Sequence, residues 1–499
     1  MKRFIFLILI LILAVVIISC SSPDNTGSTN NQNSDGDNNN GQSSQDQGQD
    51  NAEITPEEEY EPLPEIDAEG FELRFYNYDN SWMTWAVNEL TAEEETGELV
   101  LDEIFRRNRR IESKYNCVIT ETTVGNTNDN FRNIIRSGDD LYDIIQLYDE
   151  VIAGYYTQGF MHTWEQLPHI NLAYPWWLQD ANSVFRLNNK QFAAVGAYSL
   201  AMYSRGFVLL FNKDMVADLG ISENMYNLVR EGKWTADKFA EIAKQAVYDL
   251  NGDGVMDGND RYGATTAVKL HFGALVTGAG VKYIDSDEQG NPYFAIPGNA
   301  YALDVMQKIF DVHNGTNIYY KIANDVHAGS GDAQVIFGSQ QILFVGASTR
   351  GIANYRGYEF DIGILPFPKY SEQQEKYYTL TSGTGVSVLP VTLGADRFEK
   401  VGLLAEALTR DSYQGALPAY KETTLKTKYA RDGDSADMLD IIFDSLTFDL
   451  GLSVFPQDTY YVYMENYLKM NDNFASTTEK QEPKVNAAIK KLTEAAETD

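Results

Sequence analysis

Along the first part of the chain, stretches in which apolar and polar residues alternate are followed by stretches in which apolar residues recur at helical spacing. Alternation over FELRFYNY (71–78) and CVITETTV (117–124) predicts two strands. Apolar residues recur at helical spacing between them, which predicts a helix over 99–116. The same pattern continues with a helix in FRNIIRSGDD (131–140) that ends at Gly138, a strand over 142–148 and a helix over 150–160.

The alternation resumes beyond residue 200. A strand over 205–211 precedes a helix, and Thr235 is a suitable N-cap for a helix over 236–250. Later stretches are rich in predicted strand, and from Tyr413 onward the chain reads as largely helical; the strand-rich stretches are 333–348, 360–370 and 383–390. Strands alternating with helices predict an α/β fold with mixed, mostly parallel sheets.

The first twenty residues predict export. Lys2 and Arg3 precede an unbroken apolar run from Phe4 to Ile18, which is short for a membrane span and typical of a signal peptide over 1–19. The run ends in Ile-Ile-Ser-Cys and resembles the bacterial lipobox, so Cys20 is the predicted lipidation site. An uncleaved N-terminal anchor is the alternative.

Composition changes sharply after the signal peptide. Residues 21–59 are mainly Asn, Gln, Ser, Asp and Gly, which cannot bury enough apolar surface to fold, so 20–69 is predicted to be a disordered tether. Cys117 is the only other cysteine and is expected to be a small core residue. The net charge of −33 disfavours nucleic acid and anionic membrane as partners.

The stretch DLNGDGVMDGND (249–260) has the spacing of a calcium-binding loop. Its expected oxygen ligands stand at loop positions 1, 3, 5, 7, 9 and 12, the seventh through its backbone carbonyl: Asp249, Asn251, Asp253, Val255, Asp257 and Asp260. Gly254 allows the sharp turn at position 6. A strand rather than a helix is predicted after the loop, so a structural Ca²⁺ is expected rather than a sensor. A turn without metal is the alternative.

Four stretches in this order carry a family resemblance: NRRIESKYN, LLFNKDMVADLG, DIGILPFPK and RDGDSADMLDIIFDSLTFDLG. The chain resembles the extracellular solute-binding lipoproteins of bacterial ABC importers, of the maltose-binding type (family 1), in a clostridial-type branch. The resemblance implies a periplasmic-binding-protein-like fold (type II), with ligand held between two hinged lobes. Mapped on this sequence, lobe one is 70–190 plus 385–412, and lobe two, with the calcium loop, is 191–384 plus 413–499. The crossings fall at Gln191–Ser199, Tyr377–Thr384 and near Ser412.

Aromatic and polar residues at the ends of predicted strands are the candidate ligand contacts, because such ends face the cleft in folds of this kind. Sugars stack on aromatic rings and bind charged and amide groups through their hydroxyls. Any single aromatic can instead pack in the core, and the Trp176–Trp177 pair is expected to be structural. The candidates are Tyr78, Asp79, Trp82, Trp85, Tyr148, Asp149, Tyr203, Ser348, Thr349 and Arg350.

Motifs of enzymes are missing from the sequence. It contains no GxSxG, HExxH or P-loop pattern, and its five histidines show no zinc spacing. The resemblance therefore predicts a non-enzymatic, monomeric, lipid-anchored protein on the outer face of the membrane. It would deliver a solute, preferably an oligosaccharide, to ABC permease subunits. A peptide ligand, and a surface sensor or adhesin without a transporter, are the alternatives, and an enzyme acting on glycosides is a less favoured one.

Overall fold

The computed structural model describes residues 60–79, 81, 83–84, 86–265, 270–287, 290–314, 316–320, 330–355, 357–421 and 433–498. The predicted signal peptide, Cys20 and most of the tether lie outside these residues, as do Trp82 and Trp85. Residues Leu63–Asp499 form one compact unit, which holds all the elements described below. This unit is not divided further, so the predicted lobe boundaries stay predictions.

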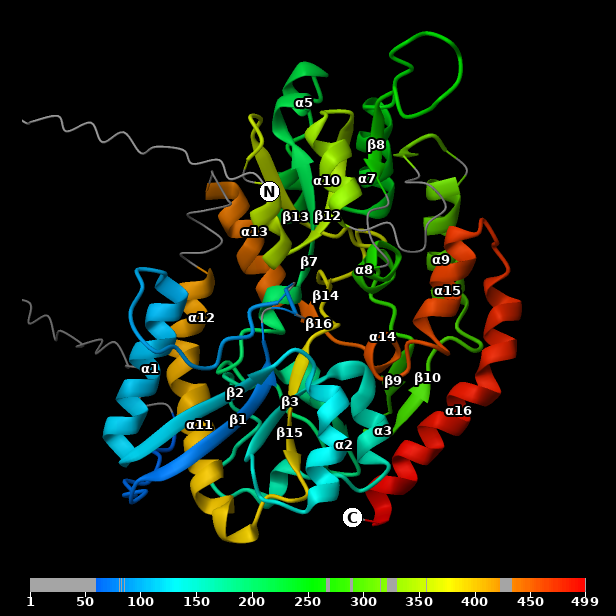
Figure 1. Cartoon of the computed structure of the whole chain (residues 1–499). Helices are drawn as coiled ribbons and strands as arrows, with labels where there is room; N and C mark the ends of the chain where they lie inside the picture. Colours follow the sequence, from blue (N-terminus) through cyan, green and yellow to red (C-terminus); the bar gives the residue numbers. More distant parts are fainter. Residues whose placement is uncertain are drawn as a thin grey trace, which may run out of the picture. The chain divides into compact units, whose positions relative to one another are not determined.

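Two five-stranded sheets organise this unit (Figure 1). The first has the order β2-β1-β3-β15-β4, and the second β11-β8-β12-β7-β13. The first consists of β1 (Phe71–Tyr78), β2 (Cys117–Val124), β3 (Ile144–Tyr148), β4 (Met161–His162) and β15 (Gly385–Pro390). The second consists of β7 (Phe207–Asn212), β8 (Tyr262–Thr265), β11 (Tyr319–Tyr320), β12 (Ile342–Ser348) and β13 (Ile362–Pro366).

Both sheets are mixed, and the expected α/β class is confirmed. β1 pairs in parallel with β2 and β3, whereas β15 runs antiparallel to β3 and β4. In the second sheet β8 pairs in parallel with β11 and β12, and β7 runs antiparallel to β12 and β13. The parallel share is smaller than the strand-helix alternation predicts, because β15 and β7 enter their sheets from segments that cross between the sheets.

Local signals set several helix ends where the sequence places them. Thr235 caps α7 (Ala236–Gln245) by accepting the N–H of Lys238, and Gly138 ends α2 (Thr127–Ser137) at a φ of 73°. The strand-rich prediction for 333–348 was wrong in its first half, which belongs to helix α10 (Ser330–Gly338). Ala333 and Phe337 are both buried at a spacing of four, so helical packing prevails over the strand preference of the β-branched residues between them.

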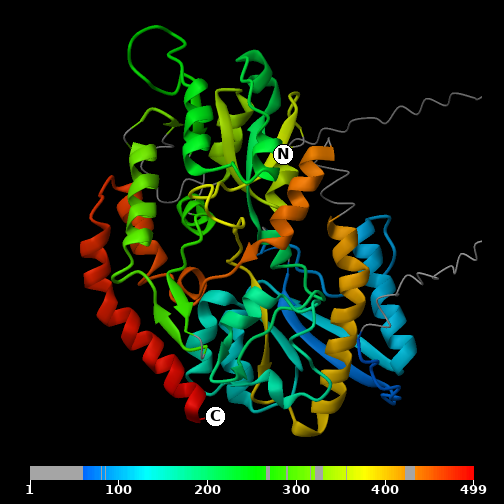
Figure 2. The same cartoon turned by 180° about the vertical axis from the view of Figure 1, so that it is seen from behind.

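Helices cover the sheets on both faces. α1 (Leu99–Tyr115) and α11 (Phe398–Gln414) lie side by side along the first sheet in both views (Figures 1 and 2). The second sheet packs against α13 (Gly433–Asp444) and α7. α16 (Phe474–Thr498) contacts both α9 (Ala300–Asn314) and α3 (Ile152–Tyr156). The prediction of a largely helical C-terminal part is confirmed for its described residues.

The chain crosses between the two sheets three times. It passes from β4 to β7, returns from β13 to β15, and passes again from α11 to α13. The second and third passages pair as the short strands β14 (Thr379–Leu380) and β16 (Leu446–Thr447). None of the helices in the described ranges combines the length and hydropathy needed to cross a bilayer.

Candidate functional site

The carboxyl ends of β1 and β3 lie at one edge of the first sheet, because the two strands are parallel neighbours. Tyr78 ends β1 and Tyr148 ends β3. The Tyr78 hydroxyl donates to Asn128 Oδ1 at 2.6 Å and accepts the backbone N–H of Tyr148 at 2.6 Å. Tyr78 is buried and therefore fixes the strand end, whereas Tyr148 is half-buried beside it.

Asp149 joins this strand end to the crossing segment that leads into β15. Its Oδ2 accepts the N–H of Gly383 at 2.9 Å, and its own N–H donates to the carbonyl of Thr384 at 3.1 Å. The side chain is fully buried, and its Oδ1 accepts no hydrogen bond from any described residue. A buried carboxylate oxygen without a donor is costly.

Arg205 approaches the same segment from the start of the second sheet, at the end of η3 (Tyr203–Arg205). Its Nε donates to the carbonyl of Ser382 at 3.1 Å, and its guanidinium lies 5.1 Å from the ring centroid of Phe207. A Cβ placed on Gly383 would come 3.1 Å from the Tyr148 hydroxyl and 3.4 Å from Arg205 Nη2. Gly383, with a φ of 74°, is thus the point at which Tyr148 and Arg205 converge.

A fourth element reaches this place from the C-terminal part of the chain. Tyr461, in α15 (Tyr460–Leu468), donates its hydroxyl hydrogen to Glu150 Oε1 at 3.0 Å. Both side chains are half-buried. We call Tyr78, Tyr148, Asp149, Glu150, Arg205, Gly383 and Tyr461 the junction site.

Burial dominates the electrostatics of the junction site. It raises the pKa of Asp149 to about 7; Glu150 adds to the rise, while the Gly383 N–H and Arg205 oppose it. Burial also lowers the pKa of the Arg205 guanidinium and raises that of the Tyr148 phenol. The junction site thus offers carboxylate acceptors, a guanidinium donor and phenol rings close together in partly buried surroundings. Such a set of groups suits a polyhydroxylated solute.

The structure brings three of the predicted ligand residues together, namely Tyr78, Tyr148 and Asp149. Tyr203 and Thr349 contact each other: both are buried, as Tyr78 and Asp149 are, and the Thr349 hydroxyl donates to the Tyr203 carbonyl at 3.1 Å. These two residues join the ends of η3 and β12 rather than offering a surface to solvent. Of the remaining described candidates, Asp79 accepts the N–H of Ser81, Ser348 accepts the N–H of Gly351, and Arg350 is exposed.

Four members of the junction site were missed by sequence reasoning: Glu150, Arg205, Gly383 and Tyr461. Glu150 carried a usable signal, because it comes directly after Asp149 at the end of a predicted strand. The other three stand in segments whose sequence does not show which strand end they approach.

The predicted calcium loop is described in full. Asp249 accepts the N–H groups of Gly252 and Gly254, and Asp260 accepts those of Leu250 and Asp257. Among the described residues, no three His, Cys, Asp or Glu side chains form a group that could hold a metal ion. Binding would require the Asp side chains to turn from backbone N–H groups toward a common centre, so the Ca²⁺ stays a prediction.

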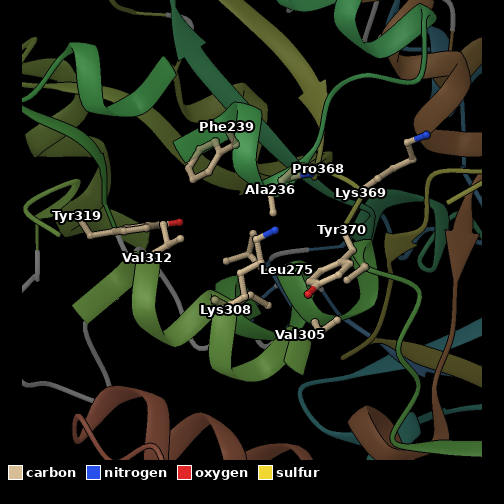
Figure 3. Close-up of a pocket in the computed structure, with 12 residues that line it drawn as sticks. Ala236, Phe239, Leu275, Val305, Lys308, Val312, Tyr319, Pro368, Lys369 and Tyr370 are labelled. Atoms are coloured by element: carbon tan, nitrogen blue, oxygen red, sulfur yellow. The ribbon is translucent and has the colours of Figure 1, made fainter. Parts of the chain in front are cut away.

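Two hollows lie away from the junction site. The smaller, of about 20 Å³, is mainly apolar and is formed around Phe239, Leu275, Val305 and Tyr319 (Figure 3). Lys308 points into it and pairs with Asp237 at 2.6 Å. The larger, of about 910 Å³, runs along the crossing segments and shares no residue with the junction site.

Comparisons with known proteins agree with this architecture. The model of the family described as bacterial extracellular solute-binding protein matches residues 114–415. No curated protein sequence matches the chain.

Similar solved structures share the fold. An ABC substrate-binding protein of Listeria monocytogenes, in complex with cycloalternan, is 12% identical with a TM-score of 0.53, over 84% of this chain and 99% of that one. The cyclic alpha-maltosyl-1,6-maltose binding protein of Arthrobacter globiformis is 14% identical with a TM-score of 0.54, over 84% of this chain and 99% of that one. The GacH receptor of Streptomyces glaucescens, solved unliganded and with acarbose, is 12% identical with a TM-score of 0.52. The match covers 84% of this chain and 99% of that one.

Proposed function

We propose that this chain, which belongs to the family of bacterial extracellular solute-binding proteins, binds a carbohydrate at the junction site and delivers it to an ABC importer. The family is non-enzymatic, so the chain is a binding protein and not an enzyme. One observation carries the proposal: Tyr148, Asp149 and Glu150 of the first sheet meet Arg205 and Tyr461 from elements beyond the crossings. A solute held there touches both sides of the hinge.

The physical reason for a carbohydrate is the pairing of groups at this place. The Asp149 and Glu150 carboxylates accept hydrogen bonds from hydroxyls, Arg205 donates them, and the Tyr148 and Tyr461 rings offer apolar faces. The solved structures named for cycloalternan, acarbose and a cyclic maltosyl-maltose support the same ligand class. We therefore favour an oligosaccharide over a peptide.

A thermal-shift panel tests the ligand class. The purified protein is mixed in turn with cyclic and linear maltooligosaccharides, other neutral oligosaccharides and peptides of matched size. A ligand at 100 times its dissociation constant should stabilise the fold by about 2.7 kcal/mol through mass action. A rise in melting temperature with a neutral oligosaccharide supports the proposal, whereas a rise with peptides alone replaces it with peptide transport.

The lipid anchor is part of the proposed function and rests on the sequence alone. Cys20→Ala should abolish lipidation, because the alanine has no sulfur to carry the lipid. The variant should leave the membrane fraction and lack the lipid mass shift. Complete retention in the membrane fraction with an unchanged mass would favour the uncleaved N-terminal anchor instead.

Calcium at residues 249–260 is the second part that rests on sequence. The ion would neutralise the four Asp side chains, so adding a chelator should lower the melting temperature. Asp253→Asn with Asp257→Asn should reduce this response. Asp139→Asn, at an exposed position outside the loop, is the control. If the chelator does not change the melting curve and the purified protein contains no calcium, the stretch is a turn without metal.

A further inference from the structure

The larger hollow runs beside the passages between the two sheets, and we call it the lateral groove. Its lining residues come from four stretches, 175–183, 229–232, 369–378 and 441–447. Its volume of about 910 Å³ lies in the upper part of the range of small-molecule sites, so the groove has room for a small solute. The solute-binding proposal does not use this groove.

Lys369 is the unusual residue of the lateral groove. It is only 3% exposed, and its ammonium donates to the carbonyl of Gln374 at 2.7 Å. The ammonium also lies 5.5 Å from the ring centroid of Tyr377. It forms no ion pair with a carboxylate of any described residue, and Glu372 acts on it only at longer range. A buried ammonium without a counter-ion costs free energy, which an anion beside it would recover.

The ammonium of Lys369 faces the lateral groove and not the small apolar pocket. Figure 3 shows the side chain pointing away from that pocket, although Lys369 contributes to its wall. A Cβ placed on Gly232, a groove residue, would come 3.1 Å from Lys369 Nζ. The ammonium therefore lies directly against a residue of the groove lining, and any side chain at position 232 would crowd it.

The other charges of the lateral groove limit the anion that fits. Lys376 and Arg230 add positive charge, but Arg230 already pairs with Asp434 and Asp437 outside the groove lining. The groove also holds three carboxylates, of Asp180, Glu375 and Asp444. These repel a phosphate, which carries nearly two negative charges, more than a single carboxylate. They also accept hydrogen bonds from hydroxyls.

We propose that the lateral groove binds a small, singly charged carboxylate that carries hydroxyl groups, such as an acidic sugar, with its carboxylate on Lys369. Tyr377 and the half-buried Tyr378 line the groove next to Lys369 and offer ring surface to the body of the ligand. This site is separate from the junction site, so both can be filled at once.

Calorimetric titration of galacturonate into the full-length protein tests the proposal, with glucose 6-phosphate and glucose as probes of charge. Galacturonate should bind more tightly than glucose 6-phosphate, and glucose should not bind in the groove. Lys369→Met should weaken galacturonate binding by roughly tenfold or more, because it removes a charge-assisted contact. Lys369→Arg should retain binding. Lys233→Met, at an exposed lysine paired with Glu231, is the matched control and should bind as the wild type does.

A second variant keeps the test independent of the folding of Lys369→Met. Ser183 is exposed on the rim of the groove, so Ser183→Trp should block the groove without disturbing the core. It should abolish galacturonate binding and leave binding at the junction site unchanged. The proposal is overturned if the wild type does not bind galacturonate at millimolar concentration. It is also overturned if Ser183→Trp binds it normally, or if Asp149→Asn abolishes that binding, which would place the anion in the junction site.

Discussion

Asp149→Asn should weaken binding of the solute by roughly tenfold to a hundredfold at pH 8, because it removes a charged acceptor of solute hydroxyls. It should also remove a pH dependence that the wild type shows. The pKa of Asp149 is about 7 in the protein without solute. A hydroxyl that donates to the ionised carboxylate favours ionisation and lowers that pKa, so wild-type affinity should rise with pH between about 6 and 8.

The same residue links stability to pH in the opposite sense. The pKa of Asp149 is raised above its ordinary value of 3.8, so the ionised form is disfavoured in the folded state. Its contribution to the stability of the unliganded protein is therefore greatest below pH 4 and falls as pH rises toward 7. Asp149→Asn should raise the melting temperature at pH 8 more than at pH 5.

Titrations of the solute into the wild type and Asp149→Asn at pH 6, 7 and 8 measure the change in affinity. Asp139→Asn, at an exposed position, is the control. If Asp149→Asn binds solute with the affinity and pH profile of the wild type, Asp149 does not contact the solute.

Glu406→Ala should destabilise the protein by about 3–5 kcal/mol, because several buried donors would lose one shared acceptor. Glu406, on α11, is 1% exposed. Its carboxylate accepts Trp176 Nε1 at 2.7 Å, Trp177 Nε1 at 2.9 Å and the N–H of Asn171 at 3.3 Å. This contact ties the first passage between the sheets to the helix that precedes the third.

Chemical denaturation with Glu399→Ala as the matched control measures this loss, because Glu399 lies on the same helix and its side chain is 65% exposed. Glu406→Gln, which keeps one acceptor oxygen, should fall between alanine and the wild type. A free energy of unfolding for Glu406→Ala equal to that of the control would show that the two indoles do not depend on this carboxylate.

The strands that carry the junction site could be predicted because their sequence pattern is local. FELRFYNY forms β1 over the predicted residues, and the strand predicted over 142–148 contains β3, so the strand-end rule leads to Tyr78, Tyr148 and Asp149. Trp176 and Trp177 were expected to be structural, and both are buried.

The rest of the site depends on contacts between distant segments. Gly383 lies 234 residues from Asp149, and Tyr461 lies 311 residues from Glu150. Which residue of a crossing segment or of α15 faces a strand end is decided by how the sheets and helices pack, and no local periodicity reports it. Tyr203 and Thr349 were candidates because they lie next to strand ends. A strand end can turn toward solvent or into the core, and local sequence does not distinguish the two; here both residues turn into the core.

A crystal structure of the protein with the oligosaccharide that the thermal-shift panel identifies tests the central claim most directly. We expect solute oxygens within hydrogen-bond distance of Asp149 or Glu150 on one side and of Arg205 or Tyr461 on the other. A solute bound in the lateral groove, or one that contacts residues of only one side at the junction, would contradict the account.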